Sequence, residues 1–337
     1  MSKRTGGAAR SMAHTRAVAC VPCRPMLISH PLQRPPVVRE IERAASTHLG
    51  TRWVARGFSD LNERASHPCG LLYGEPFSVF AKFDPAAEGG EQFTAELLGL
   101  NLLRDRAAVQ TPTPIASGVI NVEAGWLLLL EAIVEVPAAA RSPRQWRSVG
   151  RALAMAHQVH GARLGLEQFD GFFGPFRQDN RPLGSNRWAD FYAERRLIPR
   201  MQSAVDSGHL PGDLAAGVER LINRLPSLCG AEPQPSLLHG DAQQNNFLTS
   251  ATDAVLIDVA PYFGHPEIDL ALIDYFAPVP DDVFDAYRDV TPIDADFPER
   301  RELWRLFAYL AVITVEGASD FGRPFLNRVA DAIGAYR

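Results

Sequence analysis

The chain has 337 residues, of which 46% are hydrophobic and 22% charged, values that are ordinary for a globular protein. Its formal net charge is −5, and no apolar run approaches the roughly 18 residues that a membrane-spanning helix needs. This composition argues against a membrane protein and against nucleic acid as the main partner. The length allows one large domain or two medium ones.

The first 39 residues differ from the rest in charge, because they contain seven Lys/Arg and no Asp or Glu. Without them the chain has 27 basic and 39 acidic residues, a net charge of −12, which suits solubility rather than contact with a phosphate backbone. We interpret residues 1–37 as a disordered tail without a sustained hydrophobic period. Two origins remain open for it, an organelle transit peptide and an over-long gene start with Met26 as the initiator.

The four cysteines are Cys20, Cys23, Cys69 and Cys229, too few for a disulfide framework in a chain of this length. Cys20 and Cys23 form one C-x-x-C, and a zinc site would need a second pair of ligands nearby. We therefore expect no metal at these cysteines and a reducing, cytoplasmic setting.

In chain order, the first predicted elements are a strand and a helix. Residues 77–83 alternate strictly between two faces, and Lys82 lies on the second face. Residues 91–105 have apolar side chains at helical spacing and include Glu96. After a loop rich in Thr and Pro, residues 126–131 are predicted to form a buried strand that leads into a connector.

The chain beyond about residue 140 is mostly helical by pattern, with short strands near residues 236–260. Pro199 is expected to kink or split the second helix. The predicted helices cover residues 143–160, 188–205, 212–227, 299–316 and 322–336.

A strand-rich first third followed by a helix-rich remainder predicts an α+β protein of two lobes. We expect an N-lobe over residues 38–135 and a C-lobe over residues 136–337. A cleft between two such lobes is a natural ligand site.

A polar cluster with defined spacing lies near residue 240. The sequence reads H-x-D-x4-N from His239 through Asp241 to Asn246, and Asp258 ends an apolar strand twelve residues later. Phosphoryl transfer from ATP needs a carboxylate that orients or accepts the proton of the attacking hydroxyl, and oxygen ligands for Mg²⁺. It also uses a lysine that contacts the phosphates and a helical glutamate that holds this lysine.

These parts occur here in the expected order, and their conjunction is more specific than any single residue. Asp241 is the candidate catalytic base, and Asn246 and Asp258 are the candidate Mg²⁺ ligands. Lys82 is expected to contact the ATP phosphates and to pair with Glu96.

Two further segments complete the predicted catalytic and nucleotide sites. His239, in the catalytic segment, is expected to position the loop by hydrogen bonding. Glu131, Ala132 and Ile133 form the connector, whose backbone is expected to bind adenine. No G-x-G-x-x-G precedes the Lys82 strand, so the sequence does not show how the phosphates are covered between residues 56 and 70.

These residues resemble the fructosamine kinase (ketosamine-3-kinase) family, in the aminoglycoside-phosphotransferase-like branch of the protein-kinase-like superfamily. The resemblance runs from about Trp53 to Gly317. Its most specific stretch reads I-D-V-A-P-Y-F-G-H-P-E-I-D-L-A from Ile257 to Ala271, where the family has D-P-A-x-x-Y-G-H-x-E-x-D-L-A. Further similar stretches are Val79–Lys82, Phe93–Leu100 and Trp188–Pro199.

The resemblance implies a protein-kinase-like fold with a small β-rich N-lobe and a larger helical C-lobe. It also implies transfer of the ATP γ-phosphate to a hydroxyl of a ketosamine, such as a fructosamine or ribulosamine, as a small molecule or on a glycated protein. The phosphorylated adduct would then break down, so the activity would amount to deglycation.

The sequence departs from the family pattern at the catalytic loop. Gln243 stands where the family has an aromatic beside the substrate, and Val259 replaces a proline. A glutamine offers hydrogen bonds to hydroxyls or amines instead of stacking, so Gln243 bears on the acceptor.

Three more residues are candidates for contact with the acceptor, namely Trp188, Tyr262 and His265. The alternative for each is packing, because amphipathic helices bury aromatics and Tyr262 and His265 lie in a loop beside Asp258. Glu267 and Asp269 are expected to cap the following helix and brace the catalytic loop.

Three functions remain open as alternatives to a ketosamine kinase. One is a related phosphotransferase acting on an aminoglycoside, an amino alcohol or a plain sugar, which Gln243 keeps in play. Another is a catalytically silent pseudokinase scaffold, against which the retained polar residues argue. A protein kinase is the weakest alternative, because no D-F-G or A-P-E equivalent follows Asp258. The oligomeric state is not predicted.

Overall fold

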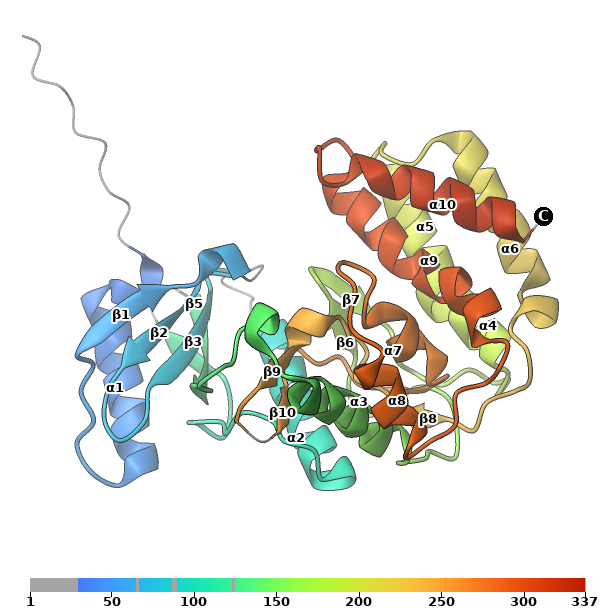
Figure 1. The fold of residues 1–337 in the computed structure, drawn as a ribbon. Coiled ribbons are helices and arrows are strands. Elements are labelled where there is room, and N and C mark those ends of the chain that lie inside the picture. Colours follow the sequence, from blue (N-terminus) through green and yellow to red (C-terminus); the bar gives the residue numbers. More distant parts are fainter. Residues whose placement is uncertain (1–29, 65–66, 87–89, 123–124, 252, 337) are drawn as a thin grey trace, which may run out of the picture.

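The structure is a computed structural model that describes residues 30–336, apart from residues 65–66, 87–89, 123–124 and 252. Most of the predicted tail, including the C-x-x-C of Cys20 and Cys23, therefore lies outside the described residues. The two proposed origins of the tail fall outside them too. The described chain forms two lobes, with the sheet in the first and most helices in the second (Figure 1). The expected α+β, two-lobe architecture is confirmed.

The N-lobe is an antiparallel sheet with two helices, and the sheet order is β1-β2-β3-β5-β4. Helix α1 precedes the sheet, and α2 follows β3 on the side of the C-lobe (Figure 1). The elements are α1 (Pro35–Leu49), β1 (Gly57–Asp60), β2 (Cys69–Tyr73), β3 (Val79–Asp84), α2 (Glu91–Ala107), β4 (Ile120–Val122) and β5 (Gly125–Glu131).

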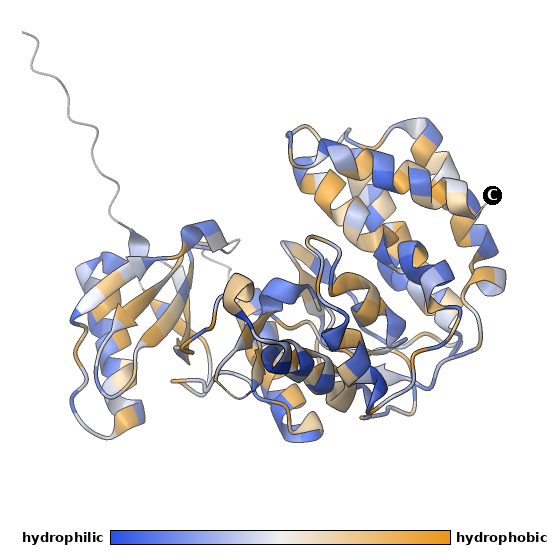
Figure 2. Cartoon of the chain, in the orientation of Figure 1, coloured by the Kyte–Doolittle hydropathy of each residue, from blue (hydrophilic) through white to orange (hydrophobic). Residues whose placement is uncertain are grey.

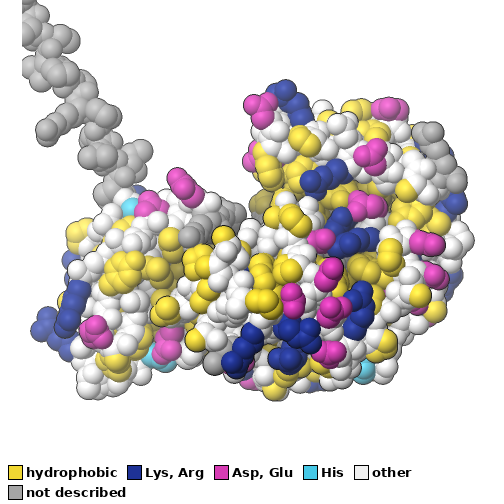
Figure 3. All heavy atoms as spheres, viewed as in Figure 1, with side chains coloured by type: hydrophobic (Ala, Val, Ile, Leu, Met, Phe, Trp, Pro, Cys, Tyr) yellow, Lys and Arg dark blue, Asp and Glu magenta, His cyan; other side chains and the backbone are white. Residues whose placement is uncertain are grey.

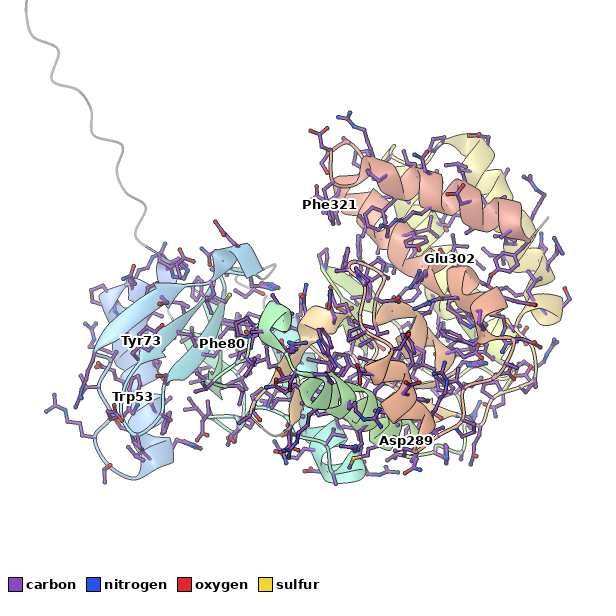
Figure 4. All side chains as sticks on the ribbon, in the orientation of Figure 1. Trp53, Tyr73, Phe80, Asp289, Glu302 and Phe321 are labelled. Atoms are coloured by element: carbon purple, nitrogen blue, oxygen red, sulfur yellow. The ribbon has the colours of Figure 1, made fainter. Side chains whose placement is uncertain are left out.

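The predicted alternation of residues 77–83 is present in β3. Val79, Ala81 and Phe83 are at most 1% exposed and pack in the N-lobe core. Phe80 points the other way, toward the C-lobe, whereas Trp53 lies on the side of α1 (Figure 4). Lys82 shares the face of Phe80, so strand periodicity aims it into the space between the lobes.

Helix α1 corrects the predicted start of the folded part. The helix begins at Pro35, and His30 caps a 3₁₀ turn over Pro31–Gln33 just before it, so residues 30–37 belong to the N-lobe rather than to a tail. The overlooked signal is an apolar stripe at helical spacing that ends at Gly50 in the left-handed region. Its buried residues are Val37, Ile41, Ala44 and Ala45.

The C-lobe is mostly helical, and its short strands pair in three two-stranded ladders, β6 with β7, β8 with β11 and β9 with β10. The helices are α3 (Pro143–His157), α4 (Trp188–Tyr192), α5 (Ile198–Asp206), α6 (Gly212–Leu228), α7 (Glu267–Leu272), α8 (Asp282–Arg288), α9 (Phe297–Glu316) and α10 (Arg323–Ala335). The strands are β6 (Gly171–Phe173), β7 (Phe176–Gln178), β8 (Ser236–Leu237), β9 (Phe247–Thr249), β10 (Ala254–Leu256) and β11 (Phe263–Gly264).

Pro199 splits its helix less sharply than expected. A π-helical turn over Ala193–Leu197 joins α4 to α5, and all three segments keep helical backbone angles. Proline lacks an N–H for the helical ladder, and a wider turn absorbs the missing bond.

The C-lobe helices pack in a shared core. Hydrophobic and hydrophilic residues alternate along α9 and α10 (Figure 2), and Leu303, Phe307, Leu310 and Ile313 of α9 are at most 1% exposed. Among the described residues, no helix is long and apolar enough to cross a membrane. Basic and acidic side chains are interspersed over the C-lobe face drawn in Figure 3.

Candidate active site

A cavity of about 240 Å³ lies between the two lobes. The five residues predicted for phosphoryl transfer all line it, and so does Gln243. Its described lining also includes His67, Gln92 and Phe172, which are among the residues that the sequence did not single out for function. The lining residues are His67, Lys82, Gln92, Ala95, Glu96, Phe172, Gly174, Asp241, Gln243, Asn245, Asn246, Asp258 and Val259.

Lys82 forms the centre of a buried charge cluster. Its Nζ lies 2.9 and 2.8 Å from the two carboxylate oxygens of Glu96 and also contacts Oδ1 of Asp258. Burial by itself would lower the pKa of Lys82, but the carboxylates of Asp258 and Glu96 outweigh it and raise the pKa. The lysine is therefore a fixed cation that bridges the two lobes.

The catalytic loop is held in one backbone conformation. Gly240 has φ of +84°, and a Cβ at this position would lie 1.9 Å from the carbonyl oxygen of Ala260, so the position requires glycine. Asp269 accepts hydrogen bonds from the N–H groups of His239 (2.6 Å) and Gly240 (3.1 Å). Asp269 thus braces the loop, as the sequence predicted.

The carboxyl group of Asp241 follows this braced turn and lines the cavity. Burial raises its pKa to about 7, and the negative charge of Asp258 adds to the shift. A carboxylate with a pKa near 7 is a stronger base than an ordinary aspartate and remains largely ionised at slightly alkaline pH.

Asn246 and Asp258 are joined through the backbone around Asp241. The Asn246 side chain donates from Nδ2 to the backbone carbonyl oxygen of Asp241 (2.8 Å), and the backbone carbonyl of Asn246 accepts the N–H of Ile257 (3.0 Å). Asp258 follows with φ of +52°, a conformation that non-glycine residues adopt rarely. These contacts place a carboxylate and an amide oxygen on one wall of the cavity.

The oxygen donors of Asp258 and Asn246 fit Mg²⁺, which takes one or two protein oxygens and completes its shell with phosphate and water. The described residues contain no group of three or more His, Cys, Asp or Glu side chains suited to hold a metal by themselves.

His239 is a positioning residue. Its side chain is fully buried, its Nδ1 accepts the N–H of Asp241 (3.3 Å), and its ring lies 5.0 Å from that of Phe247. Burial lowers the pKa of His239, which favours the neutral ring, and its hydrogen bond with Asp241 is of the kind expected for the predicted positioning role. It is absent from the described lining of the cavity.

The connector offers fewer free backbone donors than expected. The N–H of Glu131 donates to Thr113, and the N–H of Ala132 donates to Ser78, both at 2.8 Å. These two donors are therefore occupied within the N-lobe. Among the hydrogen bonds of the described residues none uses the N–H of Ile133. The Glu131 carboxylate pairs with His48 at 2.8 Å.

Of the four candidate acceptor contacts, Gln243 alone is among the described residues lining the cavity. Its Nε2 lies 3.4 and 3.3 Å from the carboxylate oxygens of Asp241. The amide of Gln243 and the carboxylate of the candidate base therefore lie side by side in the cavity lining.

The other three acceptor candidates are core residues, which corrects the expectation. Trp188 is 1% exposed and stacks on Phe191 and Tyr192. Tyr262 is 1% exposed and lies 4.0 Å beneath the guanidinium of Arg196. His265 is buried, and burial lowers its pKa to about 4. The packing alternative holds for each.

Glu267 has a role in the C-lobe core instead of at the catalytic loop. Both of its carboxylate oxygens bind Arg300, at 2.9 and 2.6 Å, and one also accepts the indole N–H of Trp304 (2.7 Å). These contacts fasten α7 to α9.

A two-lobe fold in which a buried lysine–glutamate pair faces two aspartates and an asparagine defines a phosphotransferase of the kinase type. Similar solved structures agree on the fold. The spectinomycin phosphotransferase in complex with ADP and spectinomycin has a TM-score of 0.52 at 16% identity, covering 90% of this chain and 94% of its own.

The chain belongs to the fructosamine kinase family, whose model matches residues 37–333. The crystal structure of a candidate fructosamine-3-kinase from Thermobifida fusca has a TM-score of 0.74 at 28% identity, covering 88% of this chain and 99% of its own. The probable ketoamine kinase YniA of Escherichia coli K12 is 32% identical over 219 residues, 65% of this chain and 73% of its own length.

A plant relative matches over a similar length. The chloroplastic protein-ribulosamine 3-kinase of Arabidopsis thaliana is 27% identical over 224 residues, 66% of each chain. The resemblance inferred from the motifs is thereby confirmed, and the chain is an enzyme of the phosphotransferase class.

Proposed function

We propose that this chain uses Mg²⁺ and ATP to phosphorylate a hydroxyl group of a ketosamine, free or on a glycated protein. The observation that carries the proposal is the meeting of Lys82, Glu96, Asp241, Asn246 and Asp258 in one cavity. The names of the bacterial and plant relatives support a ketosamine as the acceptor. A cytoplasmic location remains a prediction.

The nucleotide enters with its adenine at the connector. The N–H of Ile133 donates to the base, while Phe80 on the cleft face of the sheet supplies an apolar surface. Lys82 contacts the phosphates and stays oriented by Glu96, 2.8 Å away. Such a preorganised cation stabilises phosphate charge without reorganisation during the reaction.

The carboxylate of Asp258 contacts Lys82. Asp258 and Asn246 would hold Mg²⁺, which would supply positive charge to neutralise the phosphates. Lys82 would contact the phosphates and keep its pairing with Glu96.

Asp241 orients the attacking hydroxyl of the acceptor and accepts its proton. The carboxylate lies in the cavity beside Gln243, and its raised pKa suits a base that works near neutral pH. The amide of Gln243 can donate to a second hydroxyl or accept from an amine of the acceptor. Asp269 keeps the loop in place through the backbone of His239 and Gly240.

An acceptor screen tests this proposal. ADP release is measured with a ribulosamine, a fructosamine, and an aminoglycoside, each with and without Mg²⁺. We expect Mg²⁺-dependent turnover of a ketosamine, lost in Asp241→Asn while the variant still binds Mg-ATP. Turnover of an aminoglycoside with none on any ketosamine would reject the ketosamine assignment.

A phosphotransferase acting on another small hydroxyl compound is the second candidate. Gln243 favours it, because this residue lines the cavity where the family has an aromatic. A pseudokinase scaffold would instead bind nucleotide and show no turnover on any acceptor in the same screen.

A further inference from the structure

His67 occupies the segment where the sequence lacks a glycine-rich phosphate-covering loop. It lies in the connection between β1 and β2, two residues before Cys69, whose backbone pairs directly opposite Lys82. The carbonyl of Pro68 accepts the N–H of Phe83 (2.8 Å), and the N–H of Cys69 donates to Asn62 (2.9 Å). The backbone after His67 is therefore fixed against the strand that carries Lys82.

The ring of His67 is oriented by α2. Its centroid lies 5.0 Å from that of Phe93, with an angle of 63° between the two planes. Phe93 lies three residues before Glu96 on the same helix, so one helical turn positions both the ring of His67 and the partner of Lys82. His67 lines the same cavity as Lys82 and Asp258.

The chemistry of the imidazole suits a phosphate. A glycine-rich loop covers ATP by presenting backbone N–H groups, and a histidine ring supplies an N–H donor from its side chain in either neutral tautomer. Lys82 provides the charge on this wall of the cavity, and His67 adds a directional donor beside it.

From this geometry we propose that His67 donates a hydrogen bond to the phosphates of ATP and replaces a donor of the missing glycine-rich loop. This inference rests on the proposed ATP-dependent function and names a residue of its nucleotide site. The competing role for His67 is packing against Phe93, without contact to the nucleotide.

Two substitutions separate these roles. His67→Phe keeps an aromatic ring against Phe93 and removes the N–H, whereas His67→Gln restores a donor without an aromatic ring. His160→Gln, at an exposed position after α3, is the matched control. Titration calorimetry with Mg²⁺ measures the dissociation constants of ATP, ADP and AMP for each protein, and steady-state kinetics measure KM for the acceptor.

For His67→Phe we expect about a tenfold or greater rise in the ATP dissociation constant, the size of a lost hydrogen bond to a charged group. The loss of affinity should be largest for ATP and smallest for AMP, and His67→Gln should recover part of the ATP affinity. KM for the acceptor should not change. Unchanged ATP affinity in His67→Phe would overturn the inference, and so would an equal loss for all three nucleotides. If the unaltered chain binds no ATP, both the proposed function and this inference fail. If the unaltered chain turns over ATP and His67→Phe binds ATP with the same affinity, this inference alone fails.

Discussion

The carboxylate of Asp269 accepts a hydrogen bond of 2.6 Å from the backbone N–H of His239, two residues before the candidate base. The same carboxylate accepts from Gly240 and from the ring of His157, whose other nitrogen meets the hydroxyl of Tyr287 at 2.7 Å. All of these side chains are buried. A chain of buried hydrogen bonds thus runs from α8 through α3 to the catalytic loop.

Asp269→Asn should lower kcat with little effect on nucleotide affinity. The amide keeps the shape but places an NH2 group where one of the two carboxylate oxygens accepted a backbone N–H, so the loop must shift, and a shift of about 1 Å can cost about 10²-fold in rate. The measurements are kcat from ADP release and the dissociation constant for Mg-ATP. His157→Gln tests the same chain from its other side with a smaller expected loss. A normal kcat in Asp269→Asn would show that the brace is dispensable.

The pKa of Asp241 makes stability depend on pH in a defined direction. Burial raises this pKa to about 7, whereas an unfolded aspartate has a pKa of about 3.9. Between these values the folded chain holds a proton that the unfolded chain has lost, so the free energy of unfolding falls as pH rises from about 4 to about 7.

Asp241→Asn should remove this part of the pH dependence. The measurement is urea unfolding of both proteins without nucleotide at pH 5 and pH 8. At pH 8 the free energy of unfolding of the variant should exceed that of the parent by on the order of 1–4 kcal/mol. At pH 5 the gain should be smaller. An equal difference at both pH values would mean that Asp241 titrates near its ordinary pKa.

Trp188→Phe should cost stability without altering KM for the acceptor. Trp188 is 1% exposed and packs among aromatic rings, and its indole N–H has no hydrogen-bond partner among the described residues. The substitution therefore removes packing contacts and no hydrogen bond. We expect a loss of about 0.5–3 kcal/mol in the free energy of unfolding. Urea unfolding and acceptor kinetics provide the two measurements. A raised KM with unchanged stability would restore Trp188 as an acceptor contact.

The sequence predicted the parts of the site that rest on periodicity and spacing. Alternation in β3 placed Lys82 on the cleft face, and a single helical register placed Glu96 within 2.9 Å of it. The aromatic acceptor candidates were wrong because a pattern of Trp and Tyr is the same for a pocket and for a core. Burial distinguishes a pocket residue from a core residue. For Trp188 it depends on a contact with Trp304 of α9, more than 100 residues later in the chain.

His67 and Phe172 were missed for a related reason. His67 is one histidine in an irregular loop, and no spacing ties it to Lys82 before β2 pairs with β3 at Cys69. Phe172 belongs to a hairpin whose Gly174 carbonyl accepts the side chain of Gln92 (3.2 Å) across the two lobes. Contacts between lobes have no local signal in the chain.

Gln243→Trp tests which feature of the cavity selects the acceptor. The substitution removes the amide beside Asp241 and restores the aromatic of the family pattern in the cavity that Phe172 also lines. If Gln243 binds hydroxyl or amine groups of the acceptor, the variant should lose about tenfold in kcat/KM, as expected for a lost hydrogen bond of about 1.4 kcal/mol.

The loss in Gln243→Trp should differ between acceptors that carry different amines, since stacking on the new ring favours an aromatic amine. The measurement is kcat/KM for the ribulose adducts of benzylamine and methylamine, with Gln243→Glu as a variant that keeps the length and one acceptor oxygen but replaces the NH2 donor by a second, charged oxygen. Equal kcat/KM for the parent and both variants on both adducts would place acceptor selection elsewhere in the cavity.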